Sequence, residues 1–134
     1  MKYFEVYDSK TVRVETFTEQ DIYTSTETSD AIDVRDYEGK ISVFVIADKA
    51  NAGTIITHLE QSVNGSTSFT DLVSVEGATN FTTITSSVSG IYALNYNVEA
   101  SQRYIRAVTT FAAGANSCAL TVFFMGKKSR SIGA

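Results

Sequence analysis

Between residues 40 and 72 the chain carries runs rich in β-branched residues on either side of a loop that contains glycine. Alternation with a period of two predicts half-buried strands, here over residues 41–46 and 54–60. The first of these runs leads through a polar loop at 48–53, and Asn64-Gly65 after the second is a strong hairpin signal. We therefore expect three consecutive strands that pair as a β-meander.

The same alternation recurs along the rest of the chain. Turn residues separate the apolar runs at the spacing of about 8–12 residues that is typical of sandwiches and barrels. No segment has helical periodicity over three turns, and no repeat of fixed period is present. The sequence predicts an all-β protein, an antiparallel β-sandwich of jelly-roll or immunoglobulin-like topology with about 8–10 strands. Further strands are expected at residues 2–7, 11–17, 32–34, 69–75, 81–85, 91–97, 103–111 and 117–125.

Composition limits what can stabilise this sandwich. The chain of 134 residues has the size of one domain and contains a single cysteine, Cys118, so it forms no intrachain disulfide. No apolar run reaches the roughly 18 residues of a membrane span, and the first residues lack the apolar region of a signal peptide. We therefore expect a protein that is made in the cytoplasm and is stabilised by packing alone.

Charge divides the chain into three parts. Residues 1–38 carry a net charge of −6 and the remainder carries +2, whereas residues 127–134 hold three cations and no anion. We expect an N-terminal arm or edge strands over residues 1–30, a sandwich core over 31–126 and a basic C-terminal tail over 127–134. With a pI of about 4.9 the chain lacks the basic face that nucleic acid binding needs.

The final predicted strand is apolar on both faces. Leu120, Val122 and Phe124 alternate with Ala119, Phe123 and Met125. Such a strand is either central and covered on both sides or presents one face to a partner, because the outer face of a two-layer sandwich normally meets water. The second alternative implies burial between subunits.

No constellation of residues predicts chemistry. His58 is the only histidine and lies within a strand, no serine stands in a nucleophile elbow, and Cys118 lies in an apolar strand where a thiol is usually inert. Asp30, Asp33 and Asp36 lack the spacing of a calcium loop. We expect a structural His58, no catalytic site, no metal and no cofactor.

The segment 103–106 places Tyr104 and Arg106 on one face of a strand. The two side chains could stack as a cation–π pair, or Arg106 could reach a carboxylate on a neighbouring strand. We expect a structural strand pair.

Three stretches carry a family resemblance. They are Ala31-Ile32-Asp33-Val34-Arg35 with Tyr37 and Gly39, Leu59-Glu60-Gln61-Ser62 with Asn64-Gly65 and Phe69-Thr70-Asp71, and Arg103-Tyr104-Ile105-Arg106-Ala107-Val108. In this order they resemble small β-sandwich structural proteins of tailed bacteriophages, namely capsid decoration or head-associated proteins. The resemblance covers about residues 30–126, and the first thirty residues do not follow it.

The resemblance implies a virion component without enzymatic activity. A protein of this kind, made in the host cytoplasm, decorates or cements the capsid as a symmetric homo-oligomer, which we expect to be a trimer bound to the major capsid protein, with no nucleic acid and no membrane as partner. Weak contacts repeated by symmetry would then supply the stability. Candidate capsid or subunit contacts are Tyr3, Phe4, Phe17, Phe123, Met125, Lys127, Lys128 and Arg130.

Two other classes of function stay open. One is a carbohydrate-binding or adhesion module of a tail fibre or baseplate, which would use exposed tyrosines such as Tyr92 and Tyr96. The other is a head-completion or tail protein. An enzyme is the weakest candidate.

Overall fold

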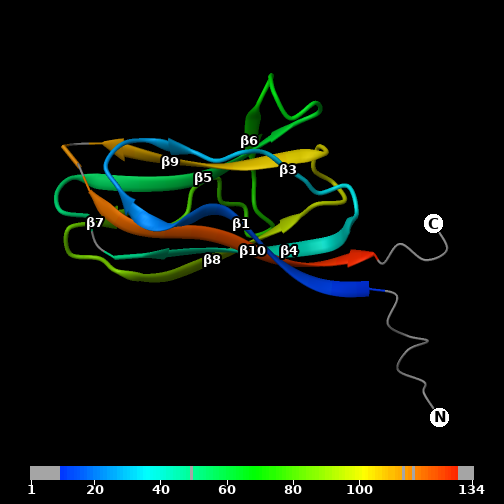
Figure 1. Ribbon diagram of the computed structural model, residues 1–134, viewed down its shortest axis with the longest axis horizontal. Coiled ribbons are helices and arrows are strands. Elements are labelled where there is room, and N and C mark those ends of the chain that lie inside the picture. Colours follow the sequence, from blue (N-terminus) through cyan, green and yellow to red (C-terminus); the bar gives the residue numbers. More distant parts are fainter. Residues whose placement is uncertain (1–9, 49, 113, 116, 130–134) are drawn as a thin grey trace, which may run out of the picture.

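Two antiparallel β-sheets lie face to face in the computed structural model, which describes residues 10–48, 50–112, 114–115 and 117–129 (Figure 1). All ten secondary-structure elements of these residues are strands. The all-β antiparallel sandwich predicted from alternation is therefore confirmed. The expected strand over residues 2–7 lies outside the described residues.

Each sheet can be followed strand by strand. Sheet A has the order β1 (Lys10–Tyr23), β10 (Cys118–Ser129), β4 (Tyr37–Ala47) and β8 (Gly90–Asn97). Sheet B has β9 (Tyr104–Ala112) and β5 (Thr54–Ser62) at its centre, with the short strands β2 (Glu27–Thr28) and β3 (Ile32–Asp33) beside β9 and the short strands β6 (Thr70–Leu72) and β7 (Ile84–Thr85) beside β5.

The first and last described strands are neighbours. β1 pairs with β10 from Lys10 opposite Ser129 to Tyr23 opposite Cys118, with register shifts around Thr18. β1 therefore extends beyond the strand that we expected at residues 11–17 and continues to Tyr23. β10 likewise continues through Lys127 and Lys128, so the first residues of the predicted basic tail are strand residues.

The core fills the space between the sheets. Ile41, Val43 and Val45 of β4 are fully buried, as are Ile55 and Leu59 of β5. Because successive side chains of a strand point to opposite faces, each of these strands directs one set of alternate side chains, its inward phase, into the core. The other set, its outward phase, lies on the outer face of the sheet. The inward phase of β10 completes the core from sheet A.

Phe124 is the aromatic centre of this core. Its ring packs on Phe17 at 5.3 Å and edge-on against Tyr37 at 5.2 Å between centroids. The Tyr37 hydroxyl donates to the Glu15 carboxylate, so β1 and β4 are linked across β10. Gly126 leaves room for this packing, since a Cβ there would lie 2.7 Å from Cγ2 of Ile41.

The predicted β-meander is wrong in one connection. β4 lies in sheet A and β5 in sheet B, so the loop between them crosses from one sheet to the other and makes no hairpin. The loop is attached to the end of β10 instead, because the Asn51 backbone N–H donates to the Ser117 carbonyl at 3.1 Å and the Asp48 N–H donates to that of Ala119 at 2.9 Å. Both strands are buried on one face, and alternation alone does not say to which of the two sheets such a strand belongs.

The connection from β5 to β6 is a hairpin with a longer loop than the Asn-Gly signal implies. Asn64 Oδ1 accepts the backbone N–H groups of Ser66 and Thr67, both at 2.9 Å, and so organises the loop from its own side chain. Gly65 has a positive φ of 78°, and a Cβ there would lie 2.9 Å from the Tyr104 ring. In Figure 1 this hairpin projects beyond sheet B near the label β6.

We predict that Gly65→Ala destabilises the protein more than Gly77→Ala does. Both glycines have positive φ, which costs alanine about 1 kcal/mol, but a Cβ at Gly77 meets nothing within 4 Å. Overpacking against Tyr104 should add about 1–3 kcal/mol at position 65 alone. Urea unfolding of the two variants measures the difference, and equal losses would show that Tyr104 yields without cost.

Tyr96 is a fully buried tyrosine whose hydroxyl finds no hydrogen-bond partner among the described residues. Burial, with a smaller contribution from Glu76, raises its pKa above the ordinary value. Above a pH of about 10 an unfolded tyrosine loses its proton while this folded one keeps it, so stability falls as pH rises.

We predict that Tyr96→Phe stabilises the protein at neutral pH by about 1 kcal/mol, because it removes an unpaired buried hydroxyl. Its unfolding free energy should also fall less steeply than that of the wild type above a pH of about 10. Tyr37→Phe is the matched control, since it removes a hydroxyl that is paired with Glu15 and should therefore destabilise at neutral pH. A loss of stability in Tyr96→Phe would contradict the assignment.

Candidate interaction surface

The outer face of sheet A is built from the outward phases of its four strands. It carries no charged residue over most of its area, and the charged residues Glu38, Lys40 and Lys127 stand together at one end of it. We use the name sheet A outer face for Val12, Val14, Thr16, Ser42, Phe44, Ile46, Ile91, Ala93, Ala119, Thr121, Phe123 and Met125.

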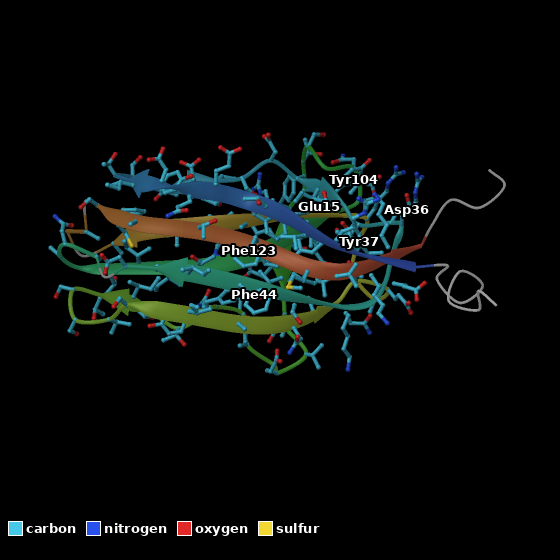
Figure 2. All side chains as sticks on the ribbon, turned by 60° about the horizontal axis from the view of Figure 1, so that its bottom comes forward. Glu15, Asp36, Tyr37, Phe44, Tyr104 and Phe123 are labelled. Atoms are coloured by element: carbon cyan, nitrogen blue, oxygen red, sulfur yellow. The ribbon has the colours of Figure 1, made fainter. Side chains whose placement is uncertain are left out.

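Two stacked phenylalanines occupy the centre of this face. Phe44 of β4 and Phe123 of β10 are directly opposite in the register, and their rings lie 5.2 Å apart with an interplanar angle of 21°. Figure 2 shows both side chains on the side of the sheet that is turned toward the viewer. Because each ring shields one side of the other, both are half-buried, but no part of the other sheet covers them.

Aliphatic side chains continue the apolar area on both sides of this pair. Val14 is 59% exposed, Ile91 is 67% exposed and Met125 is 41% exposed. Single exposed apolar residues are normal, but a continuous group on one face marks an interaction site.

The face is hollowed on either side of the phenylalanine pair. One hollow, of about 460 Å³, lies where β4, β8 and β10 run together and includes Ile46, Ile91 and Thr121. The other, of about 390 Å³, includes Val12 and Met125. The surface is therefore a central aromatic ridge between two open depressions.

The edge of sheet A at β8 is covered at Asn95. The Val75 backbone N–H donates to the Asn95 carbonyl at 2.7 Å, and the Glu76 carboxylate accepts from the Asn95 backbone N–H at 3.0 Å and from Nδ2 at 2.7 Å. Those hydrogen bonds lower the pKa of Glu76, so the carboxylate stays charged. At this one position the edge cannot pair with another strand.

The structure separates the predicted contact residues into groups. Phe123 and Met125 belong to the sheet A outer face, and Lys127 lies at its end. Lys128 lies over the Tyr37 ring, 5.6 Å from its centroid.

The prediction that Phe17 is a capsid or subunit contact is wrong, because Phe17 is buried against Phe124 in the core. Tyr3, Phe4 and Arg130 lie outside the described residues. Tyr96, proposed as an exposed sugar-stacking residue, is fully buried, and Tyr92 is half-buried.

Sequence reasoning missed Phe44 and Ile46, although a signal was present. Residues 41–47 are apolar in both phases, except for Ser42, just as the last strand is. Reading both phases of this run would have predicted a second two-faced strand. Val14 and Ile91 carry no such signal, because an exposed aliphatic residue in an edge strand cannot be told from a core residue by alternation.

The remaining predicted groups take structural positions. Arg106 pairs with the Glu60 carboxylate on β5 at 2.7 Å, which confirms the alternative of a carboxylate on a neighbouring strand. Arg103 lies over the Tyr104 ring and pairs with Asp33 at 2.8 Å. The hydrogen bond from Arg103 is the main cause that lowers the pKa of Asp33.

Comparison with known proteins finds likeness in structure alone. No protein-family model matches the chain, and no curated protein matches it in sequence at a significant level. None of the described residues forms a helix long and apolar enough to cross a membrane.

The fold is similar to solved structures of viral origin. The SPBc2 prophage-derived protein YomS is 11% identical with a TM-score of 0.55, and the alignment covers 89% of this chain and 95% of YomS. The VP2 subviral particle of infectious bursal disease virus is 13% identical with a TM-score of 0.54, over 91% of this chain and 33% of that chain. The infectious bursal disease virus Gx strain structure is 14% identical with a TM-score of 0.51, over 93% of this chain and 34% of that one. The chain thus spans nearly all of the prophage protein but a third of the chains from infectious bursal disease virus.

Proposed function

We propose that the protein is a non-enzymatic structural component of a phage particle, which assembles as a symmetric homo-oligomer and decorates or cements the capsid. The sheet A outer face is the observation that carries this proposal. An apolar ridge of stacked phenylalanines flanked by hollows is costly to expose to water and is suited to burial between protein subunits. The fold shared with a prophage-derived protein and a particle-forming viral protein supports the same class.

The strand order supports a jelly-roll assignment within the sandwich class. With β2 and β3 counted as one strand and β6 and β7 as another, the described part of the chain has eight consecutive strands, and their order is 1-8-3-6 in sheet A and 2-7-4-5 in sheet B. That is the jelly-roll order, found in viral capsid and lectin domains. The immunoglobulin order does not pair the first strand with the last.

Charge supports a protein partner. The core of the sheet A outer face is uncharged, and the charged residues at its end would form a rim. Subunit interfaces combine an apolar centre with a polar rim in this way. We assign the central ridge to contacts between copies of this chain, which we expect to be trimers, and the N-terminal segment with Tyr3 and Phe4 to the major capsid protein.

We predict that the double variant Phe44→Ser, Phe123→Ser loses self-association while it keeps its fold. The wild type should elute with the mass of several 14.6 kDa chains in light scattering after gel filtration, three if the trimer is right, and the double variant as one chain. Ile56→Ser is the matched control, because Ile56 is a half-buried outward residue of β5 on the opposite sheet. A wild type that is a single chain at micromolar concentration, or a double variant that assembles like the wild type, would refute the interface. A large ring would favour the tail or head-completion alternative.

We predict that deletion of residues 1–9 abolishes co-sedimentation with capsids assembled from the major capsid protein and leaves the unfolding free energy unchanged. The deletion stops before β1, because a longer one through residue 17 would remove the buried Phe17 and half of the β1 pairing with β10. Binding that is unchanged in the shortened protein would exclude the arm as the capsid contact.

A further inference from the structure

A second cluster of polar side chains lies on the outer face of sheet B, on the opposite side of the sandwich from the proposed interface. His58 and Glu60 are two residues apart on β5 and so share a face, and Asp71 of β6 lies opposite Glu60 in the register. Among the described residues, these three form the only group of histidine, cysteine, aspartate and glutamate side chains close enough to hold a metal ion.

The distances within the cluster match metal coordination. Nε2 of His58 lies 3.1 Å from Oε2 of Glu60 and 3.6 Å from Oδ1 of Asp71, and all three ligand atoms lie within 4.8 Å of one another. An ion bonded to each ligand at about 2.1 Å separates neighbouring ligand atoms by about 3.0 Å in octahedral or about 3.4 Å in tetrahedral geometry. The cluster therefore needs only small side-chain rotations to close around an ion.

The second oxygen of Glu60 is already held. Nε and Nη2 of Arg106 contact Oε1 of Glu60 at 2.8 and 2.7 Å, and the guanidinium lies 3.5 Å from the centroid of the Phe69 ring. This contact fixes the carboxylate so that Oε2 faces His58, the arrangement by which outer groups orient metal ligands. Arg106 is thus packed between the Phe69 ring and the Glu60 carboxylate.

The charge of the cluster also favours a cation. The side chains of Glu60 and Asp71 are acidic and that of Arg106 is basic, so their formal charges sum to −1 beside the imidazole of His58. Asp71 is 61% exposed, so an ion can enter from solvent and keep water as a further ligand.

We propose that His58, Glu60 and Asp71 bind one divalent transition-metal ion of the zinc type and so fasten the projecting β5–β6 hairpin to sheet B. An imidazole ligand selects zinc over calcium and magnesium, which prefer oxygen alone. β6 has only three residues, so a metal bond from Asp71 to β5 would add a strong link where few hydrogen bonds exist. The proposal is independent of the assembly proposed above.

The test titrates ZnCl2 into tag-free protein that has been dialysed against EDTA, with heat as the signal. The expected result is one ion per chain, with affinity reduced at least about 10-fold in Asp71→Asn and in His58→Ala. Asp71→Asn is the cleaner variant, because Asp71 is exposed and its change leaves the contacts of Glu60 with His58 and with Arg106 in place. Asp33→Asn is the matched control, since it also alters a partly exposed carboxylate on sheet B, one paired with Arg103, and it should bind zinc like the wild type.

A second measurement reads the ligand itself. His58 is the only histidine, so the imidazole nitrogen resonances belong to it without ambiguity, and one equivalent of Zn²⁺ should shift Nε2. Excess CaCl2 should not displace the zinc. The proposal is overturned by the absence of saturable binding, by equal binding in Asp71→Asn and the wild type, by an unshifted imidazole, or by displacement with calcium.

Discussion

The pairing of β10 with β1 on one side and β4 on the other is the constraint on which the rest of the structure depends. Its inward side chains, Leu120, Val122 and Phe124, reach the centre of the core, where Phe124 meets Phe17 and Tyr37. Its outward side chains include Phe123, which stacks on Phe44. One strand therefore contributes to both the hydrophobic core and the proposed interface. A substitution in β10 acts on stability or on assembly according to the phase of the residue, because successive side chains point to opposite faces.

Alternation of apolar and polar residues was enough to predict the fold class and most strands. It could not assign strands to sheets, since a strand that buries one phase looks the same in either layer, and so β4 and β5 were wrongly paired in the prediction. It also missed the extension of β1 to Tyr23, because those residues have the polar composition of a loop and become a strand only through pairing with β10. Backbone pairing over a hundred residues of separation leaves no local trace in a single sequence.

The pattern of apolar residues also predicted part of the candidate surface. Phe123 and Met125 followed from a strand that is apolar on both faces, and Phe44 could have followed from the equivalent pattern in β4. Phe17 was misplaced, because an aromatic residue in an alternating segment gives no sign of which phase is inward. The His58, Glu60 and Asp71 cluster was beyond the sequence, since Asp71 reaches it only through the register of β6 against β5.

The position of β10 within sheet A also affects the order in which the molecule can be made. β1 and β4 emerge from the ribosome well before the strand that lies between them, so neither can complete its hydrogen bonds on that side until nearly all of the sandwich has been translated. In sheet B the central pair of β5 and β9 can form as soon as β9 has been made, before β10 appears. At that stage, however, the opposite layer that would cover this pair is incomplete. Nascent chains would thus hold unpaired strand edges and uncovered apolar side chains for most of translation, the condition in which strands associate with wrong partners. Cooperative closure by the final strand then protects the core and creates the outer face in one step, so that incomplete chains carry no competent interface.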